Sequence, residues 1–335
     1  MNENRNVFPD LIGNEKLKSA LANELVSDKV GHAYILEGAK GAGKHLAARL
    51  ICASAVCEHR KDSHFPLPCG ACPTCRRILS GISVDVLSVS NGDKATIGVD
   101  AIREIRNSLY VTPNDADKKF YVIENADLMT VQAQNALLLS LEEPPPYVMF
   151  LLLCEDSSAL LETIKSRAPV IRMERFSPDF TEQYLLSHEK KPDREKAVRA
   201  AHLADGSLGR AVELYRHGDT ELKLYNLAEK LAELLISPKK SEGMVFLSSM
   251  PKDRVSTSHV LSLAKLALRD AVAAKKGGRL LFYSSSDGVP DYTKKISVRR
   301  LVELINSLTD AENDINSNCS QNTVLPSIII NSQKG

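Results

Sequence analysis

The stretch "GAKGAGKH" at residues 38–45 constrains the fold of this 335-residue chain more than any other. It follows the short apolar run "AYIL" at 33–36 and precedes a helical pattern that extends from Leu46 to Val56. A glycine-rich turn between a strand and a helix directs backbone amides and the helix N-terminus toward a phosphate group. The sequence therefore predicts an α/β domain in which this turn descends from a phosphate-binding loop, G-x-x-x-x-G-K-[ST].

The end of this loop departs from the pattern. Four residues suited to surrounding a phosphate are retained, namely Gly38, Gly41, Gly43 and Lys44. The next position holds His45, where a serine or threonine hydroxyl would help to bind the magnesium ion that bridges the terminal phosphates. An imidazole supplies no hard oxygen ligand for magnesium. Binding of ATP or ADP therefore stays open, whereas a magnesium-dependent reaction is disfavoured.

A second departure follows the apolar run "FYVI" at 120–123, which is predicted to be a buried strand. Working phosphate loops are paired with a strand ending in Asp-Glu, where the aspartate organises the magnesium shell and the glutamate positions the attacking water. Here Glu124 stands in the aspartate position and is one methylene longer, and Asn125 stands in the glutamate position. An asparagine cannot accept a proton as a base. Together with His45, this change predicts that the site does not hydrolyse nucleotide.

The first half of the chain alternates strand and helix patterns, which indicates a parallel sheet covered by helices. A third buried strand is predicted at 148–153, "VMFLLL". A helix from about Thr130 to Leu141 precedes it, and the prolines of "EEPPP" at 142–146 end that helix. An early helix carries an apolar side chain at every fourth residue, at Leu17, Leu21 and Leu25.

From about Phe176 the sequence reads as helical, with breaks at "HEKKPDREK" (188–196) and near "RHGD" (216–219). We therefore expect three regions along the chain. They are an α/β domain at 1–174, a small helical domain at 175–218 and a helical C-terminal domain at 219–335.

The cysteines form the sharpest local pattern. Of the seven cysteines, four are clustered in the sequence, at Cys57, Cys69, Cys72 and Cys75. Two-residue spacings let neighbouring thiolates converge on one tetrahedral ion, so one structural zinc ion per chain is predicted. Free thiols remain an alternative, as does a site in which His59 or His64 replaces Cys57. Cys52 and Cys319 read as ordinary thiols.

Composition disfavours several classes of function. A formal net charge of +1 provides no general attraction for nucleic acid or an anionic membrane, so any DNA contact must be local. The longest apolar runs are far too short to span a bilayer, so no membrane partner is expected. The first residues, "MNENRNVFPD", contain no apolar signal sequence, and clustered thiols then suggest a reducing, cytoplasmic location.

Several stretches together resemble the bacterial clamp-loader subunits of the AAA+ class. These are "FPDLIGNEKLKSALAN" (8–23), "HAYILEGAKGAGK" (32–44), the cysteine cluster, "NALLLSLEEPPP" (135–146) and "TIKSRAP" (163–169). Within that class the chain is similar to the delta prime family of DNA polymerase III subunits. The resemblance implies an AAA+ domain with a P-loop and a RecA-like parallel sheet, carrying an inserted zinc knuckle at 57–75. A helical lid domain and an all-α collar domain that oligomerises would follow.

The resemblance also implies a function. Members of this kind act as a stator that does not hydrolyse ATP. They assemble with gamma/tau and delta subunits in a hetero-oligomer that places the sliding clamp on primed DNA. They also supply an arginine, from a Ser-Arg-Cys motif, to the nucleotide site of an adjacent subunit. Ser166 and Arg167 match that motif, with Ala168 in place of the cysteine, so Arg167 is expected to act in trans as an arginine finger.

Two sensor positions of the motor subunits differ here as well. The first, a polar residue after the third strand, falls near Cys154. The second, an arginine in a Gly-Ser-x-Arg pattern, falls on Gly209, with Arg210 one residue later. Two other functions stay open. An active gamma/tau-like clamp-loader ATPase would need a hydroxyl after Lys44, and a zinc-dependent nucleic-acid-binding module is disfavoured by the near-neutral charge.

Overall fold

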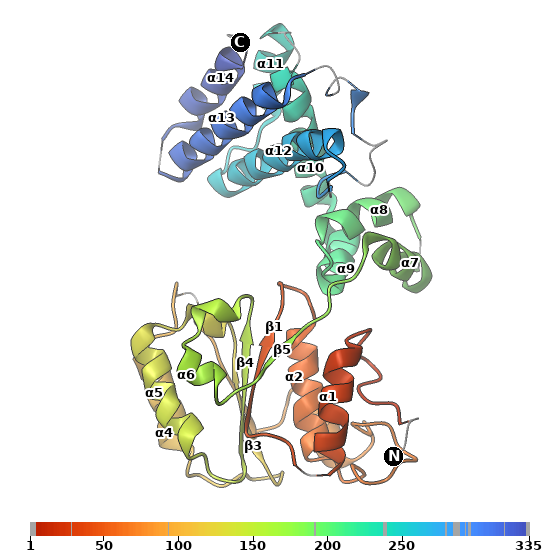
Figure 1. Ribbon diagram of the computed structural model, residues 1–335, viewed down its shortest axis with the longest axis vertical. Helices are drawn as coiled ribbons and strands as arrows, with labels where there is room; N and C mark the ends of the chain where they lie inside the picture. Colours follow the sequence, from red (N-terminus) through yellow and green to blue (C-terminus); the bar gives the residue numbers. More distant parts are fainter. Residues whose placement is uncertain are drawn as a thin grey trace. The chain divides into compact units, whose positions relative to one another are not determined.

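The computed structural model shows a chain that divides into two compact units, residues 1–175 and 176–335, each with its own hydrophobic clusters (Figure 1). The structure describes residues 5–27, 29–92, 94–190, 192–236, 240–278, 280–283, 289–291, 293, 296–317 and 319–332. Within these ranges, no helix has both the length and the apolar character needed to cross a membrane.

The first unit is built on a five-stranded parallel sheet. Its strands are β1 (Ala33–Glu37), β2 (Val86–Val89), β3 (Lys119–Ile123), β4 (Val148–Cys154) and β5 (Val170–Arg172). They lie side by side in the order β2-β3-β4-β1-β5. Because parallel strands end at the same edge, the residues that follow β1, β3 and β4 are brought to one place. This edge carries the loop 38–43, Glu124 and Cys154.

Helices cover both faces of the sheet. They are α1 (Glu15–Val26), α2 (Lys44–Ala55), α3 (Pro73–Leu79), α4 (Val99–Ser108), α5 (Val131–Glu142) and α6 (Glu162–Lys165), with 3-10 turns η1 (Ala126–Leu128) and η2 (Ser157–Ala159). In Figure 1, α1 and α2 lie on one face, and α4, α5 and α6 lie on the other. Side chains of successive β3 residues lie on opposite faces of the sheet, as expected for a strand. Phe120 and Val122 pack with α1 and α2, whereas Tyr121 and Ile123 pack with α4 and α5.

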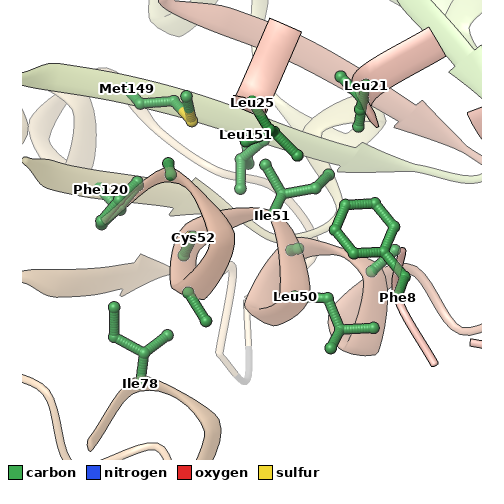
Figure 2. Packing of buried hydrophobic residues seen from close by; sticks show 14 of the residues in the cluster. Phe8, Leu21, Leu25, Leu50, Ile51, Cys52, Ile78, Phe120, Met149 and Leu151 are labelled. Carbon is green, nitrogen blue, oxygen red and sulfur yellow. The ribbon is translucent and has the colours of Figure 1, made fainter. Parts of the chain in front are cut away.

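The helix that leaves the glycine loop is held in place by packing. Figure 2 shows Leu50, Ile51 and Cys52 of α2 in the same apolar cluster as Phe8 and Leu151 of β4. All five side chains are fully buried. This packing fixes α2 against the sheet, and its N-terminus therefore has a defined position at the edge where the loop lies.

A buried leucine on α5 provides a test of this packing. Leu137 is fully buried, so Leu137→Ala is expected to lower the free energy of unfolding of the first unit by about 2–5 kcal/mol, because a cavity remains. Leu139 lies on the same helix but is 58% exposed, and Leu139→Ala should cost less than about 0.5 kcal/mol. Urea unfolding measures both changes. Equal losses from the two variants would show that α5 does not pack through this face.

The three strands predicted from sequence are confirmed as β1, β3 and β4, and the predicted leucines of α1 are all buried. Two strands, β2 and β5, were not predicted. They lie at the two edges of the sheet, are only four and three residues long, and have partly exposed side chains. An edge strand of this kind lacks the continuous apolar run that marks a central parallel strand.

The regular elements in the described part of the second unit are all helices. Its elements are α7 (Pro178–His188), α8 (Arg194–Leu203), α9 (Leu208–His217), α10 (Asp219–Ile236), α11 (Lys240–Phe246), η3 (Leu247–Ser249), α12 (Arg254–Lys275), α13 (Val298–Asn316) and α14 (Gln321–Asn331). Side-chain oxygens of Ser177, Asp193 and Ser207 cap the N-termini of α7, α8 and α9. One apolar cluster joins α7 to α9 and a larger one joins α10 to α14.

Both predicted breaks in this half are confirmed. The first separates α7 from α8, and the second separates α9 from α10. The expected boundary between a lid domain at 175–218 and a collar domain at 219–335 stays a prediction.

Candidate functional site

The glycine loop leaves β1 and enters α2 at the carboxyl edge of the sheet. Gly41 and Gly43 have φ angles of 79° and 91°, in the left-handed region that favours glycine. At Gly38, an added Cβ atom would lie 2.8 Å from the Cβ atom of Met173. The backbone conformation therefore favours glycine at two positions, and close packing requires it at the third.

Lys44, the first residue of α2, turns its side chain back onto this loop. Its Nζ atom donates to the carbonyl oxygens of Gly38 at 2.5 Å and Ala39 at 3.1 Å. Burial lowers the pKa of Lys44 from its ordinary value, although the nearby carboxylates of Glu155 and Asp127 favour the charged form. Two of the three ammonium donors are thus bound by the backbone of the loop itself.

The two positions that hold magnesium in working phosphate loops contact each other in this chain. The Nε2 atom of His45 lies 3.3 Å from Oε2 of Glu124. Asn125 has a φ angle of 52°, and its side-chain amide donates to Oδ1 of Asn91 at 3.0 Å. The imidazole therefore lies against the carboxylate that would organise a metal shell, and the side-chain amide of Asn125 donates to another side chain.

The two sensor positions, at Cys154 and next to Arg210, do not replace the missing magnesium-binding and water-positioning groups. Cys154 ends β4, is buried, and places its Sγ atom 3.9 Å from the carbonyl oxygen of Leu36. Burial raises the pKa of Cys154 to about 12, so the thiol stays neutral at ordinary pH. In the second unit, the guanidinium of Arg210 lies 3.8 Å from the carboxylate of Glu221. Arg210 thus forms an ion pair within its own unit.

Arg167 lies beyond α6, on the segment that leads into β5. One Nη atom lies 2.9 Å from Oε1 of Glu142, and the other donates to the carbonyl oxygen of Thr163 at 3.0 Å and to Oγ of Ser166 at 3.3 Å. About a third of the side chain is exposed. Within the described part of the chain, none of its polar contacts involves the glycine loop. The structure therefore groups the loop residues with His45 and leaves Arg167 apart from them.

A buried glutamine, which the sequence reasoning missed, links α5 to the segment carrying Arg167. Gln134 donates to the carbonyl oxygens of Met129 at 3.2 Å and Ala159 at 3.1 Å, and accepts from the backbone amide of Leu161 at 2.8 Å. Leu161 immediately precedes α6. The available signal was a polar side chain on the apolar face of the helix predicted at 130–141. Glu142 was missed too, because its partner lies 25 residues further along the chain.

The four clustered cysteines meet at one point. Cys57 follows α2, Cys69 lies in the next loop, Cys72 caps the N-terminus of α3 and Cys75 lies within α3. Their Sγ atoms all lie within 4.8 Å of one another. A hydrogen bond from Cys75 lowers the pKa of Cys57 to about 5, while that same bond and burial raise the pKa of Cys75. Four thiols at this spacing fit the tetrahedral set that binds structural zinc.

The alternative fourth ligands do not join this group. The ring of His59 packs against that of Phe65, with centroids 4.3 Å apart and planes tilted by 34°. The backbone amide of His64 donates to Asp62, and the histidine is exposed. Cys52 lies in the apolar core, where burial raises its pKa. Cys319 is exposed in the second unit. The geometry therefore favours four thiolates over a mixed site.

Comparison with known proteins agrees with this fold. A family described as DNA polymerase III, delta subunit, matches residues 13–177. The delta prime subunit of Bacillus subtilis DNA polymerase III is 26% identical over 96% of both chains. The gamma subunit of Buchnera aphidicola (Acyrthosiphon pisum) is 29% identical over 76% of this chain and 71% of its own length. The tau subunit of Escherichia coli is 31% identical, but this chain spans only 32% of its length.

Among solved structures, a gamma subunit-related protein of Thermotoga maritima has a TM-score of 0.53 and 18% identity, covering 94% of this chain and 98% of that one. This likeness concerns the fold alone. It confirms the AAA+ fold class expected from the sequence, a parallel sheet with helices followed by a mostly helical portion. The chain belongs to the clamp-loader family of DNA polymerase III, the family of the delta prime and gamma/tau subunits.

Proposed function

We propose that this chain is a clamp-loader subunit that does not hydrolyse nucleotide and that presents Arg167 to the nucleotide of an adjacent subunit. The observation that carries the proposal is the 3.3 Å contact between His45 and Glu124. In a working site these two positions would share a magnesium ion. Here the imidazole of His45 lies against the carboxylate of Glu124, and residue 125 has no carboxylate to activate water.

The remaining features support loss of hydrolysis in cis. Lys44 donates to Gly38 and Ala39, so a nucleotide would have to displace these bonds before its phosphates reached the ammonium group. Cys154 is a neutral, buried thiol and cannot replace the polar sensor side chain that would contact the attacking water. Whether ATP or ADP binds without reacting is a separate question. The amides of Gly41 and Gly43 could meet phosphate oxygens, whereas that of Gly38 donates to the carbonyl oxygen of Cys154 at 3.1 Å.

Arg167 supports a role in trans. A guanidinium is permanently charged and presents several N–H donors in a fixed plane, which suits the oxygens of a transferring phosphoryl group. The side chain is partly exposed and has no polar contact with its own loop among the described residues. Such an arginine contributes catalysis only when a neighbouring subunit brings a nucleotide to it.

The family suggests the assembly in which this would occur. We propose that the chain joins gamma/tau and delta subunits in a hetero-oligomer, with the second unit contributing the collar, and that the complex places the sliding clamp on primed DNA in the cytoplasm. Cys57, Cys69, Cys72 and Cys75 would hold one zinc ion. That ion would be structural, because four thiolates leave no coordination position for a substrate.

ATP hydrolysis by the purified chain tests the first half of the proposal. We expect no turnover above background in the presence of magnesium, and the same background for Lys44→Ala. Thermal unfolding would verify that both proteins are folded. Steady turnover that Lys44→Ala abolishes would contradict the proposal and favour a gamma/tau-like ATPase. Salt-dependent DNA binding by the chain alone would instead favour a zinc-dependent nucleic-acid-binding module.

A further inference from the structure

We infer that Glu142 is a positioning residue for Arg167, holding the guanidinium in the orientation from which it meets the phosphate of a neighbouring subunit. This inference rests on the proposed trans role of Arg167. Its basis is the 2.9 Å contact between Oε1 of Glu142 and an Nη atom of Arg167. Both side chains belong to the first unit and come from different elements, since Glu142 ends α5 and Arg167 follows α6.

The carboxylate of Glu142 comes from a rigid part of the fold. Leu137 and Leu141 anchor the last turns of α5 in the core. The prolines at 144–146 follow directly, and the amide of Val148 donates to the carbonyl oxygen of Pro145 at 2.8 Å where β4 begins. Proline fixes the backbone φ angle, so this connection has little freedom. The backbone of Glu142 is therefore held in place, and the carboxylate that it carries can orient the long side chain of Arg167.

Both Nη atoms of the Arg167 guanidinium are hydrogen-bonded within the chain, whereas other N–H groups of the same guanidinium are available. One Nη atom is bound to Glu142, and the other is bound to Thr163 and Ser166. A guanidinium has five N–H donors. Its Nε–H group has no partner among the described residues, and one hydrogen of the Nη atom facing Glu142 is also unused. Arg167 can therefore keep its bonds within the chain while it donates to phosphate oxygens.

This arrangement reduces the rotational freedom that Arg167 would otherwise lose on meeting the nucleotide. An unrestrained arginine has many side-chain conformations, and ordering them opposes every contact it makes. The pair with Glu142 is partly exposed, so it orients the guanidinium without trapping it. Glu142 thus acts on the transition state through Arg167 and not by touching the phosphate.

The expected effect of Glu142→Ala is a fall in the clamp- and DNA-stimulated turnover of the reconstituted loader. At the site served by Arg167 the fall should be about three- to tenfold, a modest share of the roughly thousandfold effect of an arginine finger. KM for ATP and the stoichiometry of the complex should not change. Glu142→Gln keeps an oxygen acceptor and should retain part of the lost turnover. Glu143→Ala, one residue further along and exposed, is the matched control.

The double variant Glu142→Ala/Arg167→Ala tests whether the two residues act as one. If Glu142 works through Arg167, the double variant should match Arg167→Ala alone, because residues in contact are not additive. A folded Glu142→Ala chain that fails to assemble would overturn the inference, and so would unchanged or increased turnover. In each of those cases the proposed function survives if Arg167→Ala still lowers turnover. If Arg167→Ala has no effect, both proposals fail together.

Discussion

Replacing Cys72 by serine is expected to release the metal from the first unit and to destabilise it strongly. Protein purified without chelator should contain about one zinc ion per chain, and Cys72→Ser should contain almost none. Three of the four cysteines are buried in the cluster that also includes Leu67 and Ile78. Structural zinc contributes roughly 10–16 kcal/mol of binding free energy in small zinc-finger peptides, so its loss should lower the unfolding temperature clearly.

The control for this change is Cys319→Ser. Cys319 is exposed and lies outside the cysteine cluster, so its replacement should leave the zinc content and the unfolding temperature as they were. Elemental analysis and thermal unfolding on the same preparations measure both quantities. Wild-type protein that is free of zinc, yet folds and assembles normally, would contradict a structural metal site at these cysteines.

Replacing Arg167 by alanine is expected to lower ATP hydrolysis by the assembled loader while the complex still forms. An arginine finger contributes roughly a thousandfold or more to turnover where chemistry limits the rate. The loader as a whole should lose only the share of turnover carried by the site that Arg167 serves, because other sites keep their own arginines. Clamp- and DNA-stimulated hydrolysis and the stoichiometry of the complex are measured together.

Arg194→Ala is a suitable control for this variant. Arg194 also pairs with a carboxylate, that of Glu182 at 3.1 Å, but it lies in the second unit. Its replacement should change neither hydrolysis nor assembly. If Arg167→Ala prevents assembly, Arg167 is an interface residue and not a finger. If it changes nothing, the assignment of a trans role is wrong.

Much of the fold could be predicted because its central strands carry continuous apolar runs. The stretches 120–123 and 148–153 are buried on both faces, and such strands stand out from their surroundings. The edge strand β2 could not be recognised in this way, because "VLSV" is short and its side chains are partly exposed. The residues that pair across the sheet are far apart in sequence, so the strand order came only with the structure.

In the candidate site, too, local patterns could be predicted from the sequence and long-range contacts could not. The spacing of Cys69, Cys72 and Cys75 predicted that these thiols would meet, because residues so close in sequence converge through local geometry. The contacts of His45 with Glu124 and of Arg167 with Glu142 join residues from different elements. No local pattern specifies such pairs. The sequence indicated which catalytic groups of a working site are missing. The structure showed which partners the side chains at those positions contact.

A role for this chain in trans, without hydrolysis at its own loop, is tested by comparing Lys44→Ala with Arg167→Ala in one reconstituted loader containing gamma/tau and delta subunits. The measurement is the rate of ATP hydrolysis stimulated by clamp and primed DNA, with assembly verified for each complex. We predict that Lys44→Ala leaves the rate nearly unchanged, as expected if this chain's own loop does not hydrolyse nucleotide, whereas Arg167→Ala lowers it. A loss with Lys44→Ala as large as that with Arg167→Ala, or no loss with Arg167→Ala, would contradict this role.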